Sequence, residues 1–149
     1  MTRVAILGGQ RTPFAKAGTA LKGYSALDLA KLNVTSTVEK LGLKNNQIDE
    51  LVYSSVLLNP RYPNFAREIV LRTELSNNIS AHFVSNNCIS GLVAASFLSD
   101  GIKSGRVNLG LAGGVESMSK PTLLLNNSCL LYTSPSPRDQ RGSRMPSSA

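Results

Sequence analysis

The sequence predicts an α/β fold whose sheet is mainly parallel. Within residues 1–128, short apolar segments typical of buried strands alternate with longer segments that have a helical period. Apolar residues make up 42% of the 149-residue chain and charged residues 17%, so a sizeable core can form. Strict alternation of strand and helix favours a parallel sheet joined by right-handed crossovers.

The first two predicted elements are a strand and a long helix. Residues 3–7 form an apolar run ended by two glycines, which predicts a buried strand followed by a turn. Residues 25–41 predict a helix, because Ser25 can cap it and Asp28 can complete a capping box. Apolar side chains repeat every three or four residues along one face of this helix, namely at Leu27, Ala30, Val34, Val38 and Leu41.

The middle of the chain predicts two further strands around a short helix. Residues 51–57 are apolar and end before an Asn-Pro pair, as a buried strand would. Residues 65–72 predict a short helix. In residues 79–85, the side chains of Ile79, Ala81, Phe83 and Ser85 alternate with those of Ser80, His82 and Val84. This period of two residues predicts a strand.

The last predicted elements surround a cysteine. Residues 86–88 predict a tight turn, and residues 89–103 predict a helix that is apolar on most of its circumference and therefore buried. Residues 107–112 predict a fourth strand, ended by Gly113 and Gly114. In parallel sheets the chemistry gathers at the carboxyl ends of the strands, and Cys88 follows one such end.

Composition excludes several classes of function. No apolar run approaches the length of a membrane span, and we expect neither a span nor a secretory signal. The net charge is +7, but the basic residues are scattered without aromatic neighbours, so we expect no nucleic-acid partner. Two cysteines and one histidine at no ligand spacing predict neither a metal site nor a disulfide scaffold.

Residues 129–149 differ from the rest in composition. Ser and Pro fill 8 of these 21 positions, and no strand or helix period continues. The stretch resembles a translated sequencing adapter, with residues 140–142 in the place of a sample index. We therefore predict a truncated native domain in residues 1–128 and a non-native tail in residues 129–149, and expect the natural protein to continue beyond residue 128.

Cys88 is the candidate nucleophile. Most lone cysteines in such folds are small core residues. Cys88, however, directly precedes a predicted helix, whose positive end and free backbone N–H groups favour the thiolate, the attacking species. Ser90 and Gly91 leave little side chain in the first helical turn, so a thioester could approach the backbone. A nucleophile between a strand and a helix is a recurring arrangement.

Four segments resemble the thiolase family, in order and spacing. The sequence NNCISGL at residues 86–92 is similar to the nucleophile motif of that family, and RTPF at residues 11–14 follows the first strand as it does there. PNFAREIVL at residues 63–71 resembles the second-helix segment of the degradative 3-ketoacyl-CoA thiolases. AGGVESMS at residues 112–119 resembles the glycine-rich turn after the fourth strand.

The resemblance implies a thiolase-like layered sandwich, of which this chain holds an incomplete first half with a mainly parallel sheet. It implies an acyltransferase that cleaves 3-ketoacyl-CoA to acetyl-CoA and a shortened acyl-CoA, or runs the reverse Claisen condensation, through an acyl-Cys88 intermediate. The backbone N–H of Cys88 would contribute to an oxyanion hole. The activating histidine and the second cysteine of the family lie in its second half, so the fragment itself should be inactive.

Further expectations follow from the same resemblance. Coenzyme A thioesters would be substrates, no cofactor would stay bound, and the residues that contact coenzyme A cannot be placed. The full-length form would be a homo-oligomer or part of a fatty-acid oxidation complex, in the cytoplasm or, in a eukaryote, the mitochondrial matrix. Three alternatives remain open: an acetoacetyl-CoA-forming acetyltransferase, a ketosynthase, and a non-catalytic module that binds acyl-CoA or a partner.

Other polar residues predict structural roles. Glu116 and its neighbouring serines would form a loop packed near the nucleophile, with active-site support as the alternative. His82 would be a strand residue with a solvated or hydrogen-bonded ring. Arg67 and Glu68 would form a surface charge pair or a subunit contact, and Lys103 and Arg106 would complement the dipole at a helix end.

Overall fold

A three-stranded parallel sheet with helices on both faces organises the protein. The computed structural model describes residues 3–121, so the predicted tail at residues 129–149, including Cys129, lies outside the described residues. The strands are β1 (Glu50–Ser54), β2 (Ser80–Val84) and β3 (Gly110–Gly114), and β1 lies in the middle of the order β2-β1-β3. Both pairings are parallel, which confirms the predicted α/β class.

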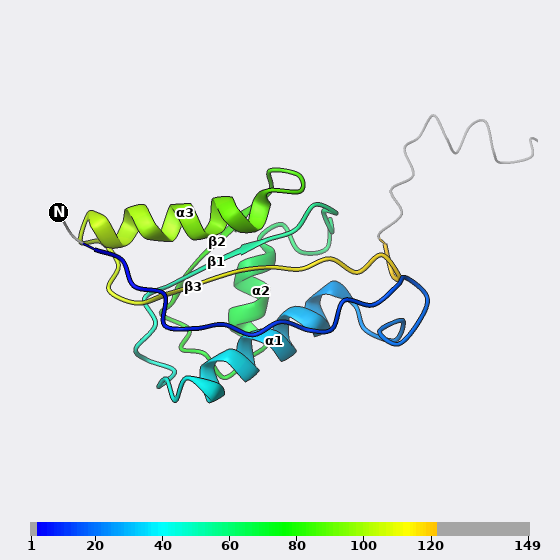
Figure 1. Ribbon diagram of the computed structural model, residues 1–149, viewed down its shortest axis with the longest axis horizontal. Coiled ribbons are helices and arrows are strands. Elements are labelled where there is room, and N and C mark those ends of the chain that lie inside the picture. The colour runs from blue at the N-terminus through cyan, green and yellow to red at the C-terminus, as the bar shows by residue number, and fades with distance from the viewer. Residues whose placement is uncertain (1–2, 122–149) are drawn as a thin grey trace, which may run out of the picture.

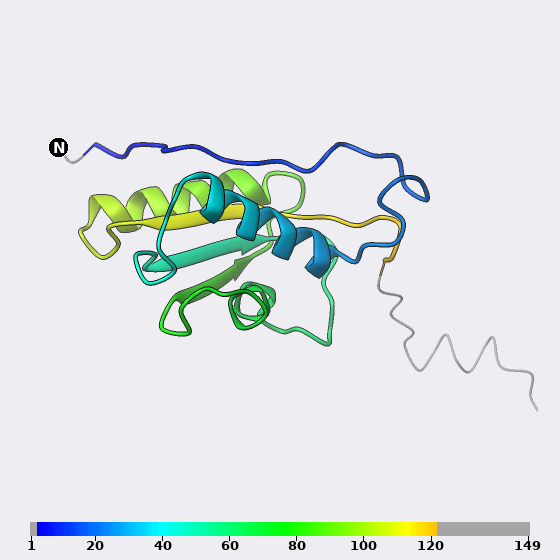
Figure 2. The same ribbon diagram turned by 90° about the horizontal axis from the view of Figure 1, so that it is seen from below.

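Three helices cover the sheet from two sides. α3 (Ser90–Lys103) lies along one face, and α1 (Ala26–Lys40) and α2 (Phe65–Leu71) lie on the other, as Figures 1 and 2 show. The residues of β1 alternate between these layers: Leu51 and Tyr53 join the core on the α1 and α2 side, whereas Val52 joins a smaller core under α3. The sheet is therefore covered on both faces, and its three parallel strands all end at the same edge.

The helix starts follow local rules. Ser25 caps α1, its hydroxyl oxygen accepts a hydrogen bond from the backbone N–H of Asp28, and the Asp28 carboxylate accepts one from the N–H of Ser25. Asn64 caps α2 in a similar way, accepting from the N–H of Arg67. The predicted capping box is confirmed.

The predicted strand at residues 3–7 is wrong. This segment runs extended past α1 and the sheet (Figure 2), but it forms no strand, and Ile6 and Leu7 are exposed. A strand requires a ladder of backbone hydrogen bonds to a neighbour, and residues 3–7 make none with the described residues. The apolar run therefore indicates an extended conformation, but it does not show whether a neighbouring strand is available for pairing.

The predicted all-round burial of the helix at residues 89–103 is also wrong. α3 buries one face, through Ala94, Leu98 and Gly101. Leu92 lies on the opposite side of α3 and is 73% exposed, whereas Phe97 lies at the margin of the buried face, beside the His82 ring of β2, and is 39% exposed. Because the sheet covers only one side of a helix, the apolar residues on the other side lack a cover among residues 3–121.

Candidate functional site

Cys88 lies in the turn that joins β2 to α3, at the carboxyl edge of the sheet. The parallel register places Val84, the last residue of β2, beside Ser54 of β1, and Ser54 beside Gly114 of β3. All three strands therefore end at this edge, and Cys88 follows four residues after Val84. Among the described residues, its thiol is free and exposed.

The turn around Cys88, which the sequence predicts at residues 86–88, is fixed by local hydrogen bonds. Asn87 has a φ of 53°, in the left-handed region that asparagine tolerates better than most residues. The buried hydroxyl of Ser90 accepts from the backbone N–H of Asn86 at 2.7 Å and donates to the carbonyl of Asn87 at 2.6 Å. Ser90, which follows Cys88, thus closes the turn by binding two residues that precede it, whereas the sequence indicates only its small size.

The first turn of α3 offers unpaired donors beside the thiol. No side chain caps this helix at Ile89. The backbone N–H groups of Gly91 and Leu92 find no acceptor within residues 3–121. Free N–H groups at a helix start carry partial positive charge and favour a negatively charged oxygen nearby.

A close contact between β3 and the start of α3 brings the glycine-rich strand end to this site. A Cβ on Gly114 would lie 2.6 Å from the Ser54 hydroxyl oxygen and 3.8 Å from the Cα of Gly91. Ser54 in turn donates to the carbonyl of Gly113 at 3.0 Å. Glycine at position 114 therefore allows β3 to end directly against the start of α3, next to the Cys88 turn.

Glu116 holds the loop that leaves β1. Its carboxylate accepts from the backbone N–H of Val56 at 2.8 Å, from that of Leu57 at 3.2 Å, and from the Ser55 hydroxyl at 3.3 Å. The sequence predicted a packed loop here, and the structure identifies the loop on which Glu116 acts. Nothing in the sequence signals this pairing, because 60 residues separate Glu116 from Val56.

The serines beside Glu116 tie the same segment to the chain before α1. Ser117 donates to the carbonyl of Tyr24 at 2.9 Å, and Ser119 accepts from the N–H of Gly18 at 2.9 Å. These two contacts join distant parts of the sequence. Residues 115–120 are consequently bound both to the loop after β1 and to the chain before α1.

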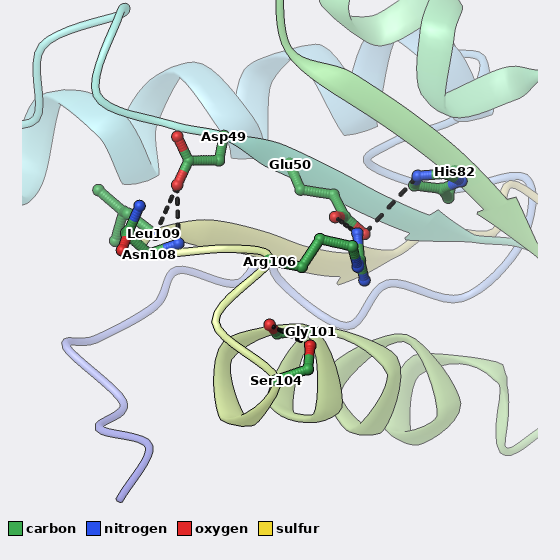
Figure 3. Close-up of polar contacts among 8 residues, drawn as sticks. All are labelled: Asp49, Glu50, His82, Gly101, Ser104, Arg106, Asn108 and Leu109. Carbon is green, nitrogen blue, oxygen red and sulfur yellow. Dashed lines mark hydrogen bonds and ion pairs between the residues drawn. The ribbon is translucent and has the colours of Figure 1, made fainter. Parts of the chain in front are cut away.

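A charge cluster lies on the α3 face of the sheet, at its amino end (Figure 3). Glu50 is 1% exposed and forms an ion pair with Arg106, and the His82 ring nitrogen Nε2 lies 3.7 Å from the second carboxylate oxygen. The predicted helix-dipole role of Arg106 is therefore replaced by a strand contact, whereas Lys103 forms only an exposed pair with Asp100. His82 is half-exposed on its strand, as expected.

Arg67 and Glu68 do not pair with each other. The Arg67 guanidinium donates to the carbonyls of Asn77 and Ile79, and Glu68 forms an ion pair with Arg72 at 2.9 Å. Adjacent residues of a helix point in different directions, so each finds a separate partner. Their roles within the described residues are structural.

Two carboxylates with lowered pKa values serve the fold. Hydrogen bonds from the side chain and backbone of Ser25 lower the pKa of Asp28. The backbone N–H groups of Asn108 and Leu109 lower the pKa of Asp49, which fastens the start of β1 to the loop before β3 (Figure 3). Residues 3–121 contain no cluster of three or more side chains that could hold a metal ion. None of their helices has the length and apolarity that a membrane crossing requires.

Comparison with known proteins identifies relatives over most of the chain. The family model "Thiolase, N-terminal domain" matches residues 4–141. The 3-ketoacyl-CoA thiolase of Pseudoalteromonas translucida (strain TAC 125) is 42% identical over 117 residues, which are 78% of this chain and 27% of that protein. The enzyme of the same name from Shewanella denitrificans is also 42% identical over 117 residues. The chain thus spans about a quarter of the length of these relatives.

Solved thiolase structures share the fold. The Acat5 thiolase from Ascaris suum, solved in complex with coenzyme A, superposes with a TM-score of 0.77 and 26% identity, over 81% of this chain and 32% of that one. The acetyl-CoA acetyltransferase of Bacillus anthracis superposes with a TM-score of 0.71 and 25% identity, over 75% and 28% of the two chains. The sequence match and the superposed fold agree. The chain belongs to the thiolase family, and residues 4–141 match the N-terminal domain of that family.

Proposed function

We propose that Cys88 is the nucleophile of a 3-ketoacyl-CoA thiolase, of which this chain supplies the first part. The observation that carries the proposal is the free, exposed Cys88 thiol, held in a hydrogen-bonded turn at the carboxyl edge of the sheet. The 42% identity to proteins named 3-ketoacyl-CoA thiolase supports the reaction type.

The proposed reaction proceeds in two half-reactions. The Cys88 thiolate attacks the keto carbon of a 3-ketoacyl-CoA, and the bond between this carbon and its neighbour breaks. The bonding electrons leave with the acetyl-CoA fragment, which takes up a proton. The thiolate of a second coenzyme A then attacks acyl-Cys88, forms the shortened acyl-CoA and releases the cysteine. The N–H groups at the start of α3 are placed to stabilise the oxygen that becomes negative in each step.

The remaining machinery belongs to the length that this chain lacks. We propose that the activating histidine and the second cysteine follow beyond residue 128, because the chain spans 27% of its relatives. Coenzyme A thioesters are the proposed substrates, supported by the solved complex of the Ascaris suum thiolase with coenzyme A. A homo-oligomer, or a fatty-acid oxidation complex, is the proposed assembly. The cytoplasmic location stays a prediction.

An acetoacetyl-CoA-forming acetyltransferase is the second candidate. The superposition with the acetyl-CoA acetyltransferase of Bacillus anthracis supports it, at 25% identity. The higher identity to the 3-ketoacyl-CoA thiolases favours the degradative reaction. If the natural protein is no longer than this chain, we expect a non-catalytic module that binds acyl-CoA or a partner.

The test begins with long-read sequencing of the source DNA across codon 128. We expect the reading frame to continue into a second half that carries a histidine and a cysteine motif. The complete protein should then cleave 3-ketoacyl-CoA, and mass spectrometry should find the acyl group on the peptide containing Cys88. Cys88→Ser should lower kcat by roughly a thousandfold or more.

Two results would contradict the proposal. A genomic stop codon after Ala149 would remove the acyltransferase activity from this product and leave the non-catalytic module. An acyl group on another residue, or full activity in Cys88→Ser, would reject Cys88 as the nucleophile. Cys88→Ser changes a single atom of an exposed side chain and should leave the fold intact.

A further inference from the structure

We infer that Glu116 is a positioning residue, which holds residues 55–58 as an apolar wall for the acyl chain carried on Cys88. The inference rests on the proposed thiolase function. It adds a determinant of acyl-chain selectivity, which acts through a loop and not through contact with the reacting atoms.

The Glu116 carboxylate and the groups that donate to it, from Ser55, Val56 and Leu57, form a clamp on the loop after β1. One oxygen of the Glu116 carboxylate accepts from two successive backbone N–H groups, those of Val56 and Leu57, at 2.8 and 3.2 Å. Both oxygens also lie 3.3 Å from the Ser55 hydroxyl. Hydrogen bonds to a carboxylate are about twice as strong as those between neutral groups, so they can fix a short loop. Without Glu116, these two N–H groups have no acceptor within residues 3–121.

The clamp is itself held rigidly. Val115 donates from its backbone N–H to the carbonyl of Ser54 at 2.9 Å, which extends the pairing of β1 and β3 up to the neighbour of Glu116. On the other side, Ser117 is buried and bonded to the carbonyl of Tyr24. Because its neighbours on both sides are fixed, Glu116 holds the loop after β1 in a defined position relative to the sheet.

The clamped loop presents apolar side chains to the outside. Val56, Leu57 and Leu58 are consecutive and 41%, 39% and 56% exposed. Three exposed aliphatic side chains in sequence, ordered by hydrogen bonds through their own backbone, form a surface suited to an apolar ligand.

The position of this wall points to the acyl chain as the ligand. The loop leaves β1 after Ser54, and the Cys88 turn leaves β2 after Val84, the residue that pairs with Ser54. Both loops therefore start side by side at the carboxyl edge, as Figure 1 shows at the end of the sheet that faces the start of α3. An acyl group bound to Cys88 is an alkyl chain at this edge, and the wall would shield it from water.

The experiment compares Glu116→Gln with Glu74→Gln in the complete protein. Both substitutions remove one negative charge, and Glu74 is exposed with no hydrogen-bond partner in the described part of the chain. The readouts are kcat/KM for a long-chain 3-ketoacyl-CoA and for acetoacetyl-CoA. In Glu116→Gln we expect the ratio of the two to fall by about tenfold, and in Glu74→Gln to stay unchanged.

Two further measurements separate positioning from general stability. Hydrogen exchange at the amides of Val56 and Leu57 should accelerate in Glu116→Gln, while exchange in the centre of β1 stays the same. Leu57→Ala, which leaves the carboxylate in place, should shift the chain-length ratio in the same direction. This second variant tests the wall even if Glu116→Gln fails to fold.

Each outcome separates the inference from the proposed function. An active wild-type protein whose Glu116→Gln and Leu57→Ala variants lose activity equally on both substrates, or lose none, would overturn the inference alone. Unchanged exchange at Val56 and Leu57 would do the same. A wild-type protein without thiolytic activity would overturn the proposed function, and with it the role of this wall.

Discussion

Removing the guanidinium of Arg106 should lower the free energy of opening of the sheet by more than the loss of an exposed ion pair would. Glu50 is 1% exposed and begins the central strand, and Arg106 is its partner across 56 residues of sequence. The second oxygen of Glu50 has no hydrogen-bond partner in the described residues and faces His82 at 3.7 Å. Arg106→Met keeps most of the apolar stem beside Phe97 but leaves the buried carboxylate without its cation.

The size of the effect follows from burial. Removing one partner of a fully buried ion pair costs about 3–5 kcal/mol, mainly because the remaining charge is desolvated. The Arg106 side chain is 49% exposed, so water reaches its end of the pair and lowers the cost. We therefore expect about 2–3 kcal/mol, which corresponds to a roughly 30- to 150-fold increase in the opening of β1. Lys103→Met, at an exposed ion pair in the last turn of α3, should change the free energy of opening by less than about 0.5 kcal/mol.

Hydrogen exchange at the amides of residues 51–53 measures this opening, whether the chain is studied alone or within a longer protein. If the buried charge is the cause, Glu50→Gln should rescue most of the loss in the double variant. A change below about 0.5 kcal/mol in Arg106→Met would refute this reasoning. So would a double variant as destabilised as Arg106→Met.

Two further predictions concern Tyr53. A Cβ at Gly113 would lie 2.3 Å from the Tyr53 ring, which packs against Phe65, so Gly113→Ala should cost about 1–3 kcal/mol by overpacking, and an unchanged exchange rate in β1 would contradict this. Burial raises the pKa of Tyr53 to about 12, so the folded state keeps the phenolic proton where the unfolded chain loses it. Stability should fall by about 2 kcal/mol as the pH rises from 10 to 12. An absorbance titration of the wild type and Tyr53→Phe measures this, and a phenol that titrates at the ordinary value would speak against it.

Local interactions explain the elements that the sequence predicted well. The capping box of α1 depends on Ser25 and Asp28, three residues apart, and the Cys88 turn depends on Asn86, Asn87 and Ser90. Such contacts are formed by residues that are already neighbours in the chain. Their residue types and spacing therefore carry enough information to place them.

Pairing over long distances explains the elements that the sequence did not predict. Residues 3–7 have the composition of a strand, but a strand depends on a neighbour that composition does not identify. The Glu50–Arg106 pair and the Glu116 clamp join residues 56 and 60 positions apart. The available signal was an acidic residue at the edge of an apolar strand, which indicates a charge near the core without identifying its partner.

The candidate site combines both kinds of interaction, and this has a consequence for how it can vary. Cys88 is oriented by its own turn, through Ser90, whereas the proposed acyl wall is positioned from β3 through Glu116. The two supports share no side chain among the described contacts. Changes at the wall can therefore alter which acyl chain is accepted while the thiol stays in place, and changes at Ser90 should affect every substrate alike.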